Sequence, residues 1–233
     1  MHKKLRFIAA TLFVPALALS QAHANSIVNG DFESGSLDGW TTYTTTNGRL
    51  VAGNESLSFD NFDVDGDGNS SLAPQFRVGQ ITYADGVQAG GGIEQSFATA
   101  AGALSLSLDV AAYLDPASTE TANSFGGLFQ VFIDGTLATS FDAASINNGQ
   151  TISQHLTFDE IVNAGVHDLK IQITRPSLNS NHFNAVTGSS MTPVQFVDDI
   201  VVDAPAPVPE PSTTLMMTLG LAMLGLIGKR RSY

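Results

Sequence analysis

From Leu104 to Leu114 every second residue is apolar, and this alternation is the feature that most limits how the chain can fold. Leucine, valine and alanine occupy the even positions, and Ser105, Ser107 and Asp109 lie between them. A strand places alternate side chains on opposite faces, whereas a helix would scatter these apolar residues around its circumference. The stretch therefore predicts a β-strand with one face in a core.

Similar patterns recur along the chain between turn residues. Asp134-Gly135 separates two apolar runs and is the sequence of a two-residue type I′ hairpin turn. The strands expected from alternation or β-branched residues are 72–83 with a break at Pro74, 93–97, 129–133, 136–141, 152–158, 167–173 and 194–202. We expect a sharp turn at Gly90-Gly91-Gly92 and one short helical turn at 159–164. The spacing predicts an all-β fold, an antiparallel β-sandwich.

The N-terminus has the three parts of a secretory signal peptide. Lys3, Lys4 and Arg6 are followed by thirteen apolar residues and by Ala22-His23-Ala24, which fits an A-x-A cleavage site. We therefore predict a signal peptide at 1–24, cleavage after Ala24 and export. A signal anchor is the alternative, but thirteen apolar residues are too few to span a bilayer comfortably.

The C-terminus combines Pro209-Glu210-Pro211, an uncharged stretch at 212–228 and the cations Lys229, Arg230 and Arg231. A helix of that length would span about 25 Å, enough for a thin bilayer, with the cations on the cytoplasmic side. The tail resembles the PEP-CTERM sorting signal. The resemblance implies processing by an exosortase, a membrane protease-transpeptidase, in a Gram-negative bacterium that produces exopolysaccharide. The alternative is an ordinary single-span anchor.

The chain is therefore expected to consist of the signal peptide, one domain at 25–203, a proline-rich linker at 204–211 and the sorting helix with its basic end at 212–233. The chain has no cysteine, so the exported domain folds without disulfides. Only Glu210 of the 22 acidic residues lies outside the domain, which contains four cations and carries a net charge of about −17. Such a surface excludes nucleic acid and attracts divalent cations. Alternatively, the acidity keeps a secreted protein soluble.

Two motifs at opposite ends of this domain resemble those of galactose-binding-like and carbohydrate-binding-module jelly rolls. They are Asn29-Gly30-Asp31-Phe32-Glu33, followed by Trp40, and Phe196-Val197-Asp198-Asp199-Ile200. The resemblance implies a jelly roll in which the first and last strands lie close together and Phe32 and Trp40 anchor the core. It also implies a structural Ca²⁺ held by Glu33 and Asp198, with Asp199 the less certain partner. Alternatively, Glu33 and Asp198 are turn and edge residues that accept hydrogen bonds from backbone donors.

A second candidate metal site lies in the loop between residues 63 and 69. Asp63, Asp65, Asp67 and Asn69 place oxygen atoms at alternate positions, and glycine occupies the sixth position, as at the start of an EF-hand calcium loop. The twelfth position is Pro74 instead of glutamate. We expect either a weak Ca²⁺ site completed by ligands from elsewhere or a solvated acidic turn.

Catalytic motifs are scarce, and we predict no catalytic residues and no enzymatic activity. The domain has only three histidines, His155, His167 and His182, and His167 falls on an apolar face typical of a core residue. The favoured interpretation is an exported cell-surface or extracellular-matrix protein associated with exopolysaccharide or biofilm. It is anchored transiently in the inner membrane through its tail before processing. The alternatives are a calcium-dependent carbohydrate-binding module and a glycan-active enzyme, which needs two carboxyl groups facing one cleft.

Overall fold

The computed structural model describes residues 23–51, 56–82, 84, 86–116, 124–176 and 193–206. These residues form strands and turns, and the part of the chain so described contains no helix able to cross a membrane. Residues 1–22 of the predicted signal peptide, residues 177–192 and the tail from residue 207 lie outside the described residues.

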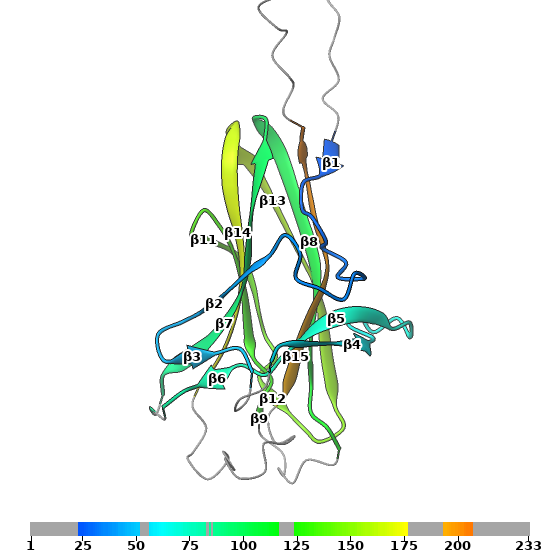
Figure 1. Ribbon diagram of the computed structural model, residues 1–233, viewed down its shortest axis with the longest axis vertical. Coiled ribbons are helices and arrows are strands. Elements are labelled where there is room, and N and C mark those ends of the chain that lie inside the picture. The colour runs from blue at the N-terminus through cyan, green and yellow to red at the C-terminus, as the bar shows by residue number, and fades with distance from the viewer. Residues whose placement is uncertain are drawn as a thin grey trace, which may run out of the picture.

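Two antiparallel sheets make up the fold (Figure 1). The first sheet has the order β13 (Thr151–Val162), β8 (Gly102–Tyr113), β15 (Val194–Pro205), β5 (Ser71–Phe76), β4 (Ser58–Phe62), and β1 (His23–Asn25) pairs with β15. The second has the order β11 (Thr136–Asp142), β10 (Leu128–Ile133), β14 (Gly165–Pro176), β7 (Gln88–Thr99), β2 (Thr41–Thr44). Two short pairs join β12 (Ser145–Ile146) to β9 (Ser124–Phe125) and β3 (Gly48–Arg49) to β6 (Gly79–Gln80).

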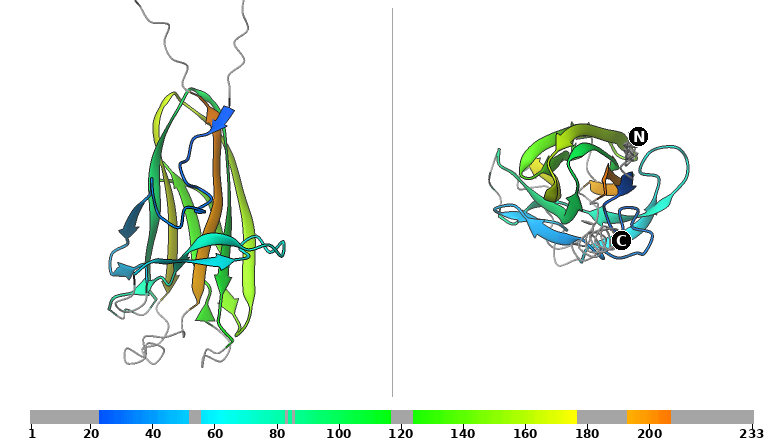
Figure 2. Two further views of the ribbon diagram at one scale, coloured as in Figure 1. Left: turned by 45° about the vertical axis from the view of Figure 1, so that its right-hand side comes forward. Right: turned by 90° about the horizontal axis from the view of Figure 1, so that it is seen from above.

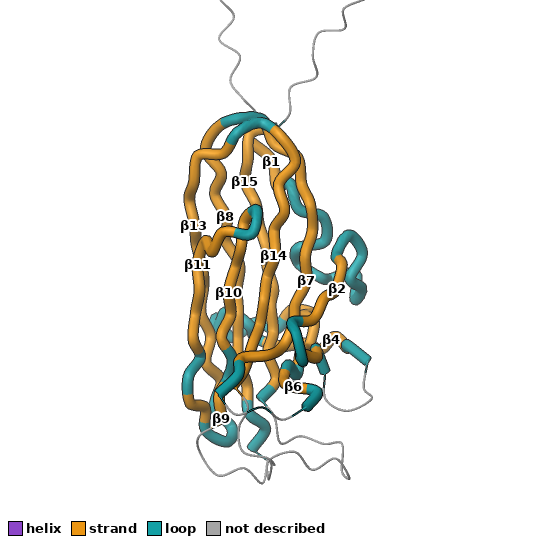
Figure 3. Tube along the Cα trace, turned by 90° about the vertical axis from the view of Figure 1, so that its left-hand side faces the viewer, coloured by secondary structure: helices purple, strands orange, loops and turns teal. Residues whose placement is uncertain are grey.

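From β7 onward the chain alternates between the sheets. β7, the β10–β11 hairpin and β14 belong to the second sheet, while β8, β13 and β15 belong to the first. The long strands run side by side along the length of the molecule (Figures 2 and 3). The predicted all-β, jelly-roll sandwich is confirmed.

The core lies between the sheets and follows the predicted alternation. Leu104, Leu106 and Leu108 of β8 are at most 1% exposed, and Leu169 and Ile171 of β14 face them from the second sheet. The hairpin prediction is also confirmed, because φ is positive at both turn residues, +50° and +75°.

The sharp turn expected at Gly90-Gly91-Gly92 is wrong, because these glycines lie inside β7. A Cβ on Gly92 would overlap the carbonyl oxygen of Ile171, and one on Gly91 would overlap that of Tyr43. The run thus marks a place where neighbouring backbones approach too closely for any side chain.

Three smaller expectations also fail. The predicted helical turn at 159–164 is mostly strand, since Asp159 and Glu160 continue the ladder from β13 to β8. The break expected at Pro74 falls later, at residues 77–78, and Pro74 lies within β5 opposite the edge strand β4. The last strand extends to Pro205, beyond the expected end at 202.

A second, smaller core covers the outer face of the first sheet. Val64 and Ala73 pack there with Phe196 of β15, and the ring of Phe62 stacks on Phe196 at a centroid distance of 4.0 Å. The β4–β5 hairpin pairs with β15 only through Gln75 and Phe76, and the rest of it folds back over the outer face of β8 and β15. Its connecting loop, residues 63–70, is placed near β8, β13 and β15.

Candidate functional site

The opening and closing motifs meet in the structure, as the resemblance implies. The backbone N–H of Ile200 donates to the carbonyl oxygen of Gly30 over 2.9 Å. A Cβ on Gly30 would overlap the carbonyl oxygen of Ile200, so this contact requires glycine. The opening motif itself is an irregular loop instead of a strand.

The predicted core anchors in this loop are confirmed. Phe32 is fully buried and Trp40 is 7% exposed, with their ring centroids 5.9 Å apart. The indole Nε1–H of Trp40 donates to the carbonyl oxygen of Asn29 over 3.0 Å. Phe32 has a φ of +49°, a conformation that is unfavourable for a bulky residue and that often occurs near functional sites.

Asp198 is the most enclosed carboxylate of the junction, with 1% of its surface exposed. It accepts hydrogen bonds from the hydroxyl of Ser71 and from the backbone N–H of Asp199. Burial raises the pKa of Asp198 to about 6, because the two hydrogen bonds only partly offset burial, while the charges of Asp199 and Glu33 raise it further.

Asp199 joins the two clusters that the sequence suggests as separate sites. The pKa of Asp199 is raised first by burial and then by the charges of Asp109, Asp65, Asp31 and Glu33. These acids are therefore electrostatic neighbours. We call the set consisting of Asp31, Glu33, Asp65, Asp109, Asp198 and Asp199 the acidic junction.

The acidic junction includes one strand residue that sequence reasoning missed. Asp109 lies directly opposite Asp198 in the β8–β15 ladder and opposite His155 in the β8–β13 ladder. Its Oδ1 lies 2.8 Å from Nδ1 of His155, whose side chain is 57% exposed. The sequence did offer one indication of a role for Asp109: it is a charged residue on the outer face of β8, where the other outward residues are Ser, Ala and Tyr.

Glu33 has a backbone partner, as the alternative interpretation expects. Its Oε1 accepts a hydrogen bond from the N–H of Leu72 over 2.9 Å. The contact fixes Glu33 to the start of β5, one residue after the hydroxyl that binds Asp198. Glu33 and Asp198 are thus both attached to residues 71–72.

The 63–69 loop brings three carboxylates together. Asp63, Asp65 and Asp67 each offer an oxygen within 4.8 Å of the others. Both oxygens of Asp63 also accept backbone hydrogen bonds, from Gly66 at 2.8 Å and Gly68 at 3.0 Å. Asn69 donates to Asp67 through its backbone and side chain, and these bonds lower the pKa of Asp67. A carboxylate oxygen has a further lone pair, so these bonds do not prevent cation binding.

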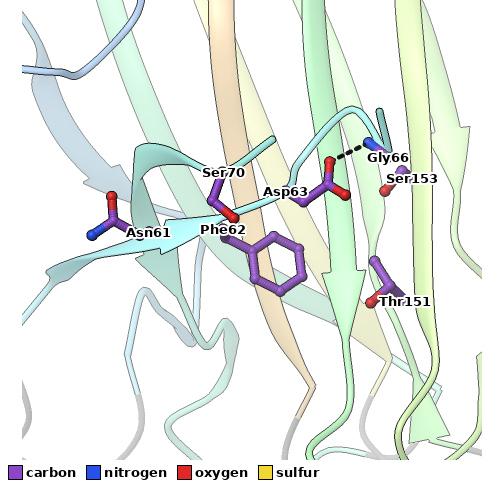
Figure 4. Close-up of a pocket in the computed structure, with 7 residues that line it drawn as sticks. All are labelled: Asn61, Phe62, Asp63, Gly66, Ser70, Thr151 and Ser153. Atoms are coloured by element: carbon purple, nitrogen blue, oxygen red, sulfur yellow. Dashed lines mark hydrogen bonds between the residues drawn. The ribbon is translucent and has the colours of Figure 1, made fainter. Parts of the chain in front are cut away.

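An open pocket of about 500 Å³ lies between this loop and β13. Figure 4 shows Asp63 turned toward the N–H of Gly66, with Ser153 and Thr151 of β13 lying beyond the loop. The lining also includes Phe62, Asn61 and Ser70. Hydroxyl, amide and carboxylate oxygens thus surround a space open to solvent.

A second polar pocket, of about 340 Å³, lies on the outer face of the second sheet. Glu94, Asp168, Lys170 and Thr41 line it. Lys170 lies opposite Glu94 in the ladder and places its Nζ 3.9 Å from the ring centroid of Tyr43. The hydroxyl of Ser96 donates to Asp168 over 2.6 Å.

His167 is a structural residue, in agreement with its predicted place on an apolar face. Its Nδ1 lies 2.7 Å from Oδ2 of Asp134, and its Nε2 lies 3.0 Å from the carbonyl oxygen of Asn163. Both partners are acceptors, so the protonated ring satisfies both, and the hydrogen bond to Asp134 is the largest cause of the raised pKa of His167. His182 lies outside the described residues.

The PEP-CTERM protein-sorting motif matches residues 207–231. The chain therefore carries this sorting signal, which implies an exported protein that is anchored transiently in the membrane and processed by an exosortase. No curated protein sequence matches the chain.

Several solved structures resemble the sandwich. TmCBM61, solved with β-1,4-galactotriose, is 9% identical, with 77% of this chain and 97% of the other covered and a TM-score of 0.43. The CBM22-1–CBM22-2 tandem of Paenibacillus barcinonensis Xyn10C is 11% identical, with coverages of 84% and 49% and a TM-score of 0.41. The enzymatically active domain of bacteriophage CBA120 tailspike protein 4 is 16% identical, with coverages of 76% and 21% and a TM-score of 0.40.

Proposed function

We propose that this protein is sorted to the surface or extracellular matrix of a Gram-negative cell, where its sandwich acts as a non-catalytic module associated with exopolysaccharide or biofilm. The observation that carries the proposal is the position of the sorting motif. β15 ends at Pro205, and the motif begins at residue 207. The motif thus follows the folded module almost directly, so processing at it would release or transfer the module as a unit.

The mature protein should lack the segment after about Pro211. An exosortase that reads Pro209-Glu210-Pro211 would remove the apolar stretch and the basic end that follow it. Intact-mass measurement of protein extracted from the cell surface tests this expectation, with a Glu210→Ala variant as the unprocessed control. A mature mass that still includes residues 215–233 would contradict processing and indicate a permanent membrane anchor.

We also propose Ca²⁺ as a structural ion of the acidic junction and the adjoining 63–69 loop. The chemistry of the donors supports this: carboxylate and carbonyl oxygens are hard ligands, and Ca²⁺ accepts six to eight of them in flexible geometry. The raised pKa of Asp198 is consistent with it, because burial destabilises the carboxylate and its two hydrogen bonds only partly offset this, so a bound cation would stabilise the charged form. There are two candidate sites: Glu33 and Asp198 are the proposed ligands at the acidic junction, and Asp63, Asp65, Asp67 and Asn69 are those of the 63–69 loop, whose three aspartates have oxygens within 4.8 Å of one another.

A second candidate function is binding of a neutral polysaccharide at the pocket of Glu94, Asp168, Lys170 and Thr41. Carboxylate acceptors, an ammonium donor and a hydroxyl can recognise the hydroxyl groups of a sugar. Lys170 lies opposite Glu94 in the ladder, and the hydroxyl of Ser96 donates to Asp168, which fixes the orientation of the Asp168 carboxylate.

A glycan array with residues 25–206 should give signals that Glu94→Gln together with Lys170→Met reduces at least tenfold. Two lost charge-assisted hydrogen bonds account for an effect of that size. Thr136→Ala, an exposed change in β11, is the matched control. An array without hits would remove this candidate. Release of new reducing ends from a bound glycan would instead indicate a glycosidase that uses the two carboxyl groups.

A further inference from the structure

The end of the sandwich from which β15 leaves is held rigidly. The carbonyl oxygen of Pro205 accepts hydrogen bonds from the N–H of Ala100 at 2.8 Å and from the hydroxyl of Thr99 at 2.9 Å. The position of Pro205 relative to the fold is therefore defined. We call this end, formed by the turns at 100–102 and 163–165 with Ile161 and Val166 beside them, the tail-proximal end (top of Figure 1).

The sorting motif begins too close to this end for an enzyme to bind the motif alone. Pro209 follows Pro205 by four residues, so a fully extended chain separates them by at most about 14 Å. Even a 100-residue domain has a radius of gyration of about 13 Å, and a catalytic cleft that holds an extended peptide has walls on both sides of it. A processing enzyme that engages the motif must therefore touch the tail-proximal end.

The side chains at this end suit such a contact. Ile161 and Val166 are 77% and 72% exposed, and they flank the β13–β14 turn. A shallow groove of about 470 Å³ extends from Ile161 to Ala103 of β8, and Asp159 and Glu160 lie along it. Ile161 thus lies beside an acidic groove on the first sheet, and Val166 lies on the second sheet, on the other side of the β13–β14 turn.

We infer that the tail-proximal end is a docking surface for the exosortase that processes this chain. The partner surface should present apolar side chains opposite Ile161 and Val166 and basic side chains opposite Asp159 and Glu160. The inference rests on the proposed processing and adds a contact outside the motif. The folded module is then part of what the enzyme recognises.

The test compares rates of tail removal for the full chain in a host that carries the matching exosortase. Ile161→Ser together with Val166→Ser should slow conversion to the shorter form roughly tenfold, as expected for loss of two apolar anchors from an interface. Ile81→Ser is the control, since Ile81 is 70% exposed but follows β6 at the opposite end. Both substitutions change exposed residues and should leave thermal stability nearly unchanged.

A longer linker separates docking from general damage. Ten Gly and Ser residues inserted between Ala206 and Pro207 allow the enzyme to reach the motif without touching the sandwich. With this longer linker, the rates of tail removal for the double variant and its parent should differ less than about twofold. Equal rates with the native linker, or equal slowing by Ile81→Ser, would overturn the inference. If the parent chain itself is never shortened, the proposed processing fails, and the docking surface fails with it.

Discussion

Alanine at Gly92 should destabilise the sandwich by about 3 kcal/mol or more, although it adds only one methyl group. The added Cβ would overlap the carbonyl oxygen of Ile171 on the adjacent strand, and a backbone atom in a ladder cannot move aside as a flexible side chain can. β7 and β14 would have to separate locally, and the β2–β7 pairing beside them would be disturbed. Urea unfolding of residues 25–206 measures the difference.

Gly79→Ala is the matched control for this prediction. Gly79 also lies in a strand, but its Cβ would meet only the side chain of Arg49, with Nε at 3.7 Å and Nη2 at 4.0 Å, both ordinary van der Waals distances. We expect a change of less than about 1 kcal/mol there. A Gly92→Ala variant as stable as the parent would show that β7 and β14 are farther apart than described.

The second large effect concerns Asp198 and pH. A folded-state pKa of about 6, above the unfolded value near 4, means that the unfolded chain loses its proton first. The stability associated with the protonated carboxyl is complete below pH 4 and is lost as pH rises through 6. In EDTA, the contribution of Asp198 should therefore lower the free energy of unfolding by roughly 1–2 kcal/mol at pH 7 relative to pH 4. Asp198→Asn should remove this dependence on pH.

Calcium should oppose the same loss. A cation beside Asp198 stabilises the carboxylate, so 5 mM Ca²⁺ should flatten the pH slope and raise the melting temperature by a few degrees. An equal concentration of Mg²⁺ should do less, because it dehydrates reluctantly and requires octahedral geometry. If the Ca²⁺–Mg²⁺ difference survives Glu33→Gln with Asp198→Asn, the ion binds at the 63–69 loop. Equal effects of both ions on the parent would remove both proposed sites.

Local alternation predicted most of the fold, because burial on one face of a strand leaves a direct trace in the sequence. The strands of Leu104–Leu114 and of His167–Ile173 show this. Gly90-Gly91-Gly92 was misread because glycine permits either a turn or a close approach between strands, and only the neighbours of β7 decide which. The helical turn at 159–164 failed for a similar reason, since pairing with β8 outweighs local preference.

The candidate site could be predicted only in part. The two motifs identified Glu33 and Asp198, and the acidic loop identified Asp63 to Asn69, but nothing local to either stretch shows that they adjoin. Their proximity depends on the β4–β5 hairpin folding over the first sheet, which the stacking of Phe62 on Phe196 stabilises. Asp109 was missed because its role depends on its register partners, Asp198 and His155.

The direction in which β15 leaves the sandwich has a mechanical consequence. A pull on the tail enters a strand inside the first sheet, between β8 and β5, and runs along its length. If a partner holds the opposite end of the sandwich, near Val194 and Tyr113, the two forces act along the strands. They then slide β15 past β8, and the ladder is sheared instead of being opened one hydrogen bond at a time. Its hydrogen bonds would then share the load and have to break together.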